Sequence, residues 1–127
     1  MAIGRRLPRW PECHIPVWAA GLGEKEQQEE ILKMLQAAVN HFKGRAIIEA
    51  WQVENEPTLA GFGVCPEPDS AFFEKEVKLV RSLDSRPIAI TESGELSTWA
   101  KATELADWIG ISIYRTVWNN TLGLFTY

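Results

Sequence analysis

Three short apolar segments, separated by longer amphipathic stretches, constrain the fold of this chain most strongly. The segments are Ala46 to Val53, Ile88 to Ile90 and Asp107 to Tyr114. All three predict strands. The first is too short for a helix and too apolar for a half-exposed strand, so it is expected to be buried on both faces, and the second is also expected to be buried. The stretches between them have the spacing of helices. Strands that alternate with helices in this way predict βαβ units on a parallel sheet, and therefore an α/β fold.

The predicted helices cover residues 22–42, 69–83 and 95–106. In the first, Ile31, Leu35, Ala38 and Phe42 recur at the spacing of one buried stripe. Asp69 is placed to cap the second, in which Phe73, Val77 and Val80 form the stripe. The charged run from Glu24 to Glu30 is expected to be a solvated helix face.

Composition limits the class of protein. The 127 residues include 13 basic and 17 acidic side chains, for a net charge of −4, and 46% are hydrophobic. This balance is typical of one modest globular domain, and it argues against disorder and against a basic nucleic-acid-binding surface. No apolar run approaches the roughly 18 residues that a membrane-spanning helix requires. Residues 1–8 contain no apolar leader, so no secretory signal is visible and the compartment stays open.

Cys13 and Cys65 are the two cysteines. Two cysteines are too few for a disulfide framework, and their spacing does not fit a zinc site, so free thiols are expected. No His, Cys and Asp cluster has metal-ligand spacing, and neither a metal nor a cofactor is predicted.

The loops are asymmetric. Those that precede strands are short, such as 43–45 and 84–86, whereas those that follow strands are long and rich in Trp, Glu, Tyr and Pro. In α/β folds the chemistry is carried at the carboxyl ends of the strands, so the functional site is expected there.

The segment Trp51-Gln52-Val53-Glu54-Asn55-Glu56-Pro57 ends one predicted strand. Strand alternation predicts that Gln52, Glu54 and Glu56 share one face. A carboxyl group buried at a strand end has a raised pKa and suits a general acid, the alternative being a structural salt bridge.

This segment, preceded by Ile48, resembles the fourth-strand signature of clan A glycoside hydrolases, the retaining TIM-barrel enzymes that include cellulases, mannanases and β-galactosidases. The resemblance implies that Glu56 is the general acid/base and that Asn55 hydrogen-bonds the 2-hydroxyl of the sugar. The sugar and the linkage stay open, because parts of the motif resemble different families of the clan.

The resemblance also implies a partial (β/α)8 TIM barrel, about half of one. Residues 1–127 would form an incomplete catalytic domain covering about strands three to six, with Ile3 to His14 as the third strand and its loop. A retaining mechanism needs two carboxyl groups about 5 to 5.5 Å apart. In the clan the nucleophile is a Glu at the end of the seventh strand, which would follow Tyr127, so the chain alone is expected to have little or no turnover.

Further side chains near the predicted strand ends are candidates for binding a carbohydrate, because aromatic faces stack on sugar rings and polar groups bind hydroxyls. They are Trp10, Glu12, His14, Trp18, Glu92, Tyr114 and Trp118. The loop that holds Trp10 and Trp18 has a structural alternative. Its prolines would stiffen it, its Trp side chains would cover the rim of the barrel, and His14 would be a structural residue. Trp51, Trp99 and Trp108 are expected to pack in the interior.

Two other functions remain open. One is a catalytically inactive, carbohydrate-binding half-barrel that assembles with itself or another fragment through its open sheet edges. The other is an unrelated α/β domain, for which a pocket at the opposite strand ends would be the sign.

Overall fold

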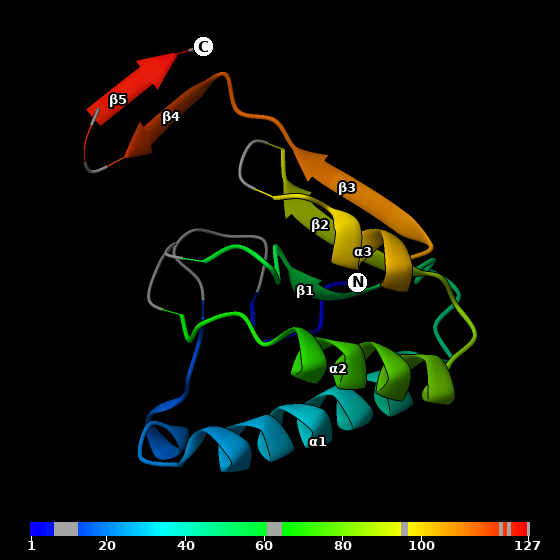
Figure 1. The fold of residues 1–127 in the computed structure, drawn as a ribbon. Helices are drawn as coiled ribbons and strands as arrows, with labels where there is room; N and C mark the ends of the chain where they lie inside the picture. Colours follow the sequence, from blue (N-terminus) through cyan, green and yellow to red (C-terminus); the bar gives the residue numbers. More distant parts are fainter. Residues whose placement is uncertain (7–12, 61–64, 95–96, 120, 122, 127) are drawn as a thin grey trace.

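The computed structural model describes residues 1–127 except 7–12, 61–64, 95–96, 120, 122 and 127. Its main sheet has three parallel strands in the order β1 (Trp51–Asn55), β2 (Ile88–Ser93) and β3 (Trp108–Ser112). Helices alternate with these strands, so the chain is α/β, as the sequence predicts (Figure 1).

The first residues of the chain lie beside β1. Ala2 forms an isolated parallel bridge with Gln52, and the amide nitrogen of Ile3 donates to the carbonyl oxygen of Gln52 at 3.0 Å. Ile3 to His14 was predicted as a strand and its loop. Among the described residues this segment forms the hydrogen bond from Ile3 and an antiparallel bridge between Arg6 and Cys13, and it begins at the expected edge of the sheet.

Two helices pack side by side against the sheet, α1 (Glu24–Phe42) and α2 (Ser70–Leu83) (Figure 1). A 3-10 turn, η1 (Val17–Ala19), precedes α1, and the short helix α3 (Ala100–Leu105) precedes β3. The Asp69 carboxylate accepts hydrogen bonds from the amide nitrogens of Ala71 and Phe72, which confirms the predicted cap of α2.

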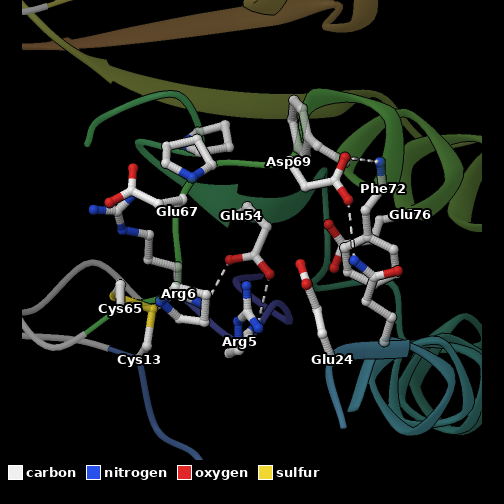
Figure 2. A pocket seen from close by; sticks show the side chains of 15 residues that line it. Arg5, Arg6, Cys13, Glu24, Glu54, Cys65, Glu67, Asp69, Phe72 and Glu76 are labelled. Carbon is white, nitrogen blue, oxygen red and sulfur yellow. Dashed lines mark hydrogen bonds between the residues drawn. A yellow bond between two sulfur atoms is a disulfide. The ribbon is translucent and has the colours of Figure 1, made fainter. Parts of the chain in front are cut away.

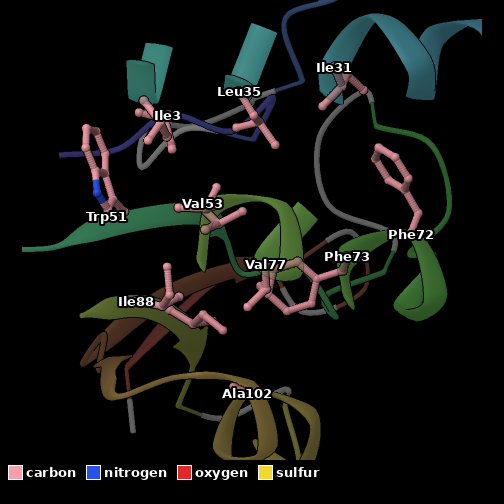
Figure 3. Close-up of a cluster of buried hydrophobic side chains, with 13 residues drawn as sticks. Ile3, Ile31, Leu35, Trp51, Val53, Phe72, Phe73, Val77, Ile88 and Ala102 are labelled. Atoms are coloured by element: carbon pink, nitrogen blue, oxygen red, sulfur yellow. The ribbon is translucent and has the colours of Figure 1, made fainter. Parts of the chain in front are cut away.

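The core lies between the helices and the sheet (Figure 3). Trp51 and Val53 of β1 are fully buried there, as is Leu35 of α1. The predicted stripes on both long helices are confirmed, since the apolar side of each is buried; the buried stripe residues are Ile31, Leu35, Val39, Phe72, Phe73, Val77 and Val80.

The structure corrects several predicted boundaries. The first strand begins at Trp51 rather than Ala46, because the chain turns after α1 through a hydrogen bond from Ile48 N to Arg45 O, which leaves Ile47 91% exposed. The third helix is shorter than predicted, although residues 95–96 lie outside the described part. The last parallel strand ends at Ser112.

A β-bulge in β1 overturns the expectation that Gln52, Glu54 and Glu56 share one face. Gln52 pairs with Ala89 and Asn55 pairs with Thr91, so the register shifts between them. The extra residue re-aims the side chains that follow it. Asn55 consequently lies on the Gln52 face, while Glu54 is buried on the other side.

Residues after β3 form an antiparallel hairpin of β4 (Thr116–Asn119) and β5 (Gly123–Thr126), drawn in orange and red in Figure 1. The sequence did not predict this hairpin. Gly123 has a φ of 68°, a backbone conformation that glycine adopts without steric cost.

The third strand is poorly covered. Trp108 is 50% exposed, so its predicted packing role is wrong, whereas the prediction for Trp51 is confirmed. Ile109 and Ile111 are also partly exposed.

Within the described ranges, no helix has both the length and the apolar character needed to span a membrane.

Candidate functional site

The carboxyl ends of β1 and β2 bring a set of polar side chains together. Gln52 Nε2 donates to Thr91 Oγ1 at 2.7 Å, and Thr91 Oγ1 donates to Asn55 Oδ1 at 2.6 Å. Because Oδ1 of Asn55 is an acceptor in this chain of hydrogen bonds, the orientation of its amide is fixed. The amide nitrogen is thereby set as a donor on the opposite side of the side chain.

Glu56 follows β1 in a left-handed conformation, with φ at 47°. Its amide nitrogen donates to Thr91 O at 2.8 Å, and its carbonyl oxygen accepts from Arg6 Nη1 at 2.6 Å and from Leu59 N at 3.1 Å. A non-glycine residue in this region is uncommon, and such residues concentrate at functional sites. The surrounding hydrogen bonds hold the backbone that carries the half-buried Glu56 side chain.

The strain at Glu56 is testable through stability. We expect Glu56→Gly to be more stable than Glu56→Ala by about 1 kcal/mol, because only glycine adopts a positive φ without steric cost. Urea unfolding of the two variants measures the difference. At Lys75, which is exposed within α2, the order should reverse, with Gly less stable than Ala by about 1 kcal/mol. Equal stabilities at position 56 would contradict the strain.

Glu92 occupies the end of β2 and is completely buried. Its Oε2 accepts from Thr58 Oγ1 at 2.9 Å. The pKa of Glu92 is raised, chiefly by burial and also by the charge of Glu56. Hydrogen bonds from Thr58 and Ser97 and the charge of Arg6 oppose the rise. Glu56, Glu92 and Arg6 therefore form one electrostatic cluster. Glu92 was expected to contact a sugar hydroxyl, and that role stays a prediction; in this structure its side chain is covered and hydrogen-bonded to Thr58.

A second acidic cluster lies beneath the first turns of α1 and α2, around a cavity of about 40 Å³ (Figure 2). Glu54 accepts hydrogen bonds from the backbone nitrogens of Arg5 and Arg6. Gly4 packs so closely that an added Cβ would stand 1.8 Å from Val53 O. Burial raises the pKa of Glu54, and these backbone hydrogen bonds oppose the rise.

Glu76 of α2 is 2% exposed and hydrogen-bonds Glu54. Burial, then the charge of Glu54, raises the pKa of Glu76 to about 10. The Glu76 carboxyl is therefore protonated near neutral pH and donates to the Glu54 carboxylate. Its Oε1 atom is buried without a hydrogen-bond partner among the described residues.

Glu76 was not among the residues predicted from the sequence. One signal was present, because Glu76 occupies the apolar stripe of α2, between Phe73 and Val80 along the helix. A carboxyl group at such a position must be paired or neutral.

The expectation of free thiols is wrong. Cys13 and Cys65 form a disulfide with a Cα–Cα distance of 5.1 Å, and both line the cavity (Figure 2). The sequence did not indicate this pairing, because the two cysteines are 52 residues apart and only the tertiary fold brings their loops together.

The structure describes four of the remaining candidates for carbohydrate contact. Trp10 and Glu12 lie outside the described residues. His14 is exposed, as are Trp18 in η1, Tyr114 after β3 and Trp118 in β4, at 65%, 60% and 57% for the last three. Exposed aromatic faces are open to a ligand, and the predicted roles of these residues stay predictions.

No group of three or more His, Cys, Asp and Glu side chains is arranged to hold a metal ion within the part of the chain that the structure describes.

Comparison with known proteins assigns no class to this chain. No protein-family model matches the chain, and no curated protein matches it.

Proposed function

We propose that this chain is part of a retaining glycoside hydrolase that cleaves β-linked oligo- or polysaccharides, with Glu56 as the general acid/base. The main observation behind this proposal is the left-handed turn at Glu56. It follows the bulged strand β1 directly and is held by backbone and Arg6 hydrogen bonds. The fixed Asn55 amide beside it supports a hydrogen bond to the sugar's 2-hydroxyl. The consecutive parallel strands are compatible with about half of a (β/α)8 barrel.

In the proposed mechanism, a carboxylate nucleophile attacks the anomeric carbon while Glu56 donates its proton to the leaving oxygen. The resulting glycosyl-enzyme ester is then hydrolysed by a water molecule that Glu56, now a base, deprotonates. Glu92 is covered and bound to Thr58, so it is poorly placed to attack a sugar. We therefore assign the nucleophile to a strand that is not in this chain.

A small external nucleophile tests this assignment. With an aryl β-glycoside, the 127-residue chain should show little turnover in buffer, but added azide should attack the anomeric carbon and release the phenol. Glu56→Gln should reduce this azide-dependent release at least about 100-fold, because the leaving oxygen then receives no proton. Phenol release followed by absorbance is the measurement, with the product identified as the glycosyl azide.

Glu24→Gln, on the exposed face of α1, is the matched control and should behave as wild type. Absence of phenol release with azide, or release that Glu56→Gln leaves unchanged, would refute the proposed function. Turnover without azide that Glu56→Gln abolishes would instead place the nucleophile within this chain and overturn its assignment elsewhere.

The exposed apolar side chains of β3 favour a second candidate, a carbohydrate-binding half-barrel that pairs with its own copy. Among the described residues, β3 pairs only with β2, and Trp108, Ile109 and Ile111 are each at least 36% exposed. An apolar strand with an open edge is a site for pairing with another chain.

This second candidate predicts a concentration-dependent dimer in sedimentation velocity. Ile111→Lys should weaken the dimer about tenfold or more, because the interface would bury an unpaired charge. Val17→Lys, at a residue that is 94% exposed in η1, should have no effect. A monomer at all concentrations would rule out self-association.

A further inference from the structure

Arg6 contacts the Glu56 turn from two sides. Its backbone carbonyl accepts a hydrogen bond from Asn55 N at 2.9 Å. Its guanidinium Nη1 donates to Glu56 O at 2.6 Å and to Leu59 O at 2.8 Å. One residue of the edge segment therefore holds the chain before and after the Glu56 side chain.

The Arg6 guanidinium is also surrounded by charge. Glu56, Glu54 and Glu92 attract it, whereas Arg5 repels it, and the Arg6 side chain is partly buried. Arg6 links the two acidic clusters, because its backbone nitrogen donates to Glu54 while its side chain faces Glu56 and Glu92. A cation at this point offsets the mutual repulsion of the nearby carboxylates.

We propose that Arg6 is the positioning residue for the Glu56 carboxyl group, an inference that rests on the proposed function. The Nη1 group donates to two carbonyl oxygens at once and fixes the left-handed turn, which sets the direction of the Glu56 side chain. Its charge offsets the electrostatic repulsion between Glu56 and Glu92. Arg6 acts through Glu56 and does not itself touch the substrate.

Nuclear magnetic resonance of the isotopically labelled chain tests this role in Arg6→Gln and Arg6→Lys. In Arg6→Gln the amides of Glu56 and Leu59 should exchange about tenfold faster, because the turn loses two hydrogen bonds. The Glu92 carboxyl resonance should titrate at higher pH, because a neighbouring cation is lost. Arg6→Lys should restore the Glu92 titration and only part of the amide protection, because the shorter lysine side chain does not bring its ammonium group to the position of Nη1 between the two carbonyl oxygens.

Arg5→Gln is the control, because it removes a neighbouring positive charge but keeps the hydrogen bonds from Arg6 to the carbonyl oxygens of Glu56 and Leu59. Wild-type amide exchange and Glu92 titration in Arg6→Gln would overturn the proposal. A uniform loss of protection that includes α1 and α2, with no excess at Glu56, would also overturn it by showing a merely structural role.

The azide assay separates this inference from the proposed function. If the wild-type chain gives no azide-dependent release while Arg6→Gln shows the expected resonance changes, the glycosidase proposal fails and the contact between Arg6 and Glu56 stands. If wild type is active and Arg6→Gln changes neither the resonances nor the rate, only the positioning role fails.

Discussion

The free energy of unfolding is expected to fall by up to about 1.4 kcal/mol for each unit of pH between about 5 and 8, and Glu76→Gln should remove most of this slope. The folded chain keeps the Glu76 proton, since the pKa of Glu76 is raised to about 10, whereas the unfolded chain releases it near the ordinary value of 4.5. Each unit of pH within this window therefore favours the unfolded chain. Over three units the loss reaches about 4 kcal/mol.

Other ionisable groups do not reverse this fall of the free energy of unfolding with pH in this window. Burial also raises the pKa of Glu54 and of Glu92, so both contribute in the same direction. Hydrogen bonds lower the pKa of Asp69 and of Asp107, and their contribution is lost only in acid, as pH falls through those lowered values. Stability should therefore be greatest at mildly acidic pH.

Urea unfolding at several pH values measures the slope. Glu76→Gln keeps the shape of the side chain and a donor to Glu54, so at pH 8 this variant should be more stable than wild type. Glu29→Gln, on the exposed face of α1, should retain the wild-type slope. An unchanged slope in Glu76→Gln would show that Glu76 is ionised in the folded chain.

Removing the disulfide should cost about 2 to 4 kcal/mol, the second large effect. Cys13 and Cys65 are separated by 52 residues, and in the chain-entropy account a loop of that length restricts the unfolded chain by about 4 kcal/mol. The double variant Cys13→Ala/Cys65→Ala, unfolded in urea beside the oxidised wild type, measures the cost.

A reductant provides the matched comparison. Reduced wild type should unfold at nearly the same urea concentration as the double variant, and the reductant should have no effect on the double variant itself. Equal stability of oxidised wild type and the double variant would show that the cross-link does not stabilise the fold.

Local patterns predicted much of the fold. The stripe that includes Ile31 and Leu35 predicted α1, and Asp69 predicted the start of α2, because both signals depend on residues that are close in sequence. The strand over residues 46–53 was placed too early, since apolar composition alone does not distinguish a strand from a turn that exposes Ile47. The β4–β5 hairpin was not anticipated.

The candidate site was predictable in part. Asn55 and Glu56 were singled out because residues 51–57 resemble a known strand-end signature, and the structure places both at the end of β1. Glu92 was among the candidates near this strand end, but the contact of Arg6 with the Glu56 turn was not predicted, because Arg6 comes from a segment distant in sequence. The bulge also separated Glu54 from the face that simple alternation assigns to it.

The sequence by itself determined the alternation of helices with the three parallel strands, the buried faces of the long helices and the strand end that carries Glu56, because these follow from the local spacing of apolar and polar residues. Only the tertiary structure decided the Cys13–Cys65 pairing, the hydrogen bond between Glu76 and Glu54, and the contact of Arg6 with the Glu56 turn. Each of these depends on groups brought together across dozens of residues, and on burial that no local pattern specifies.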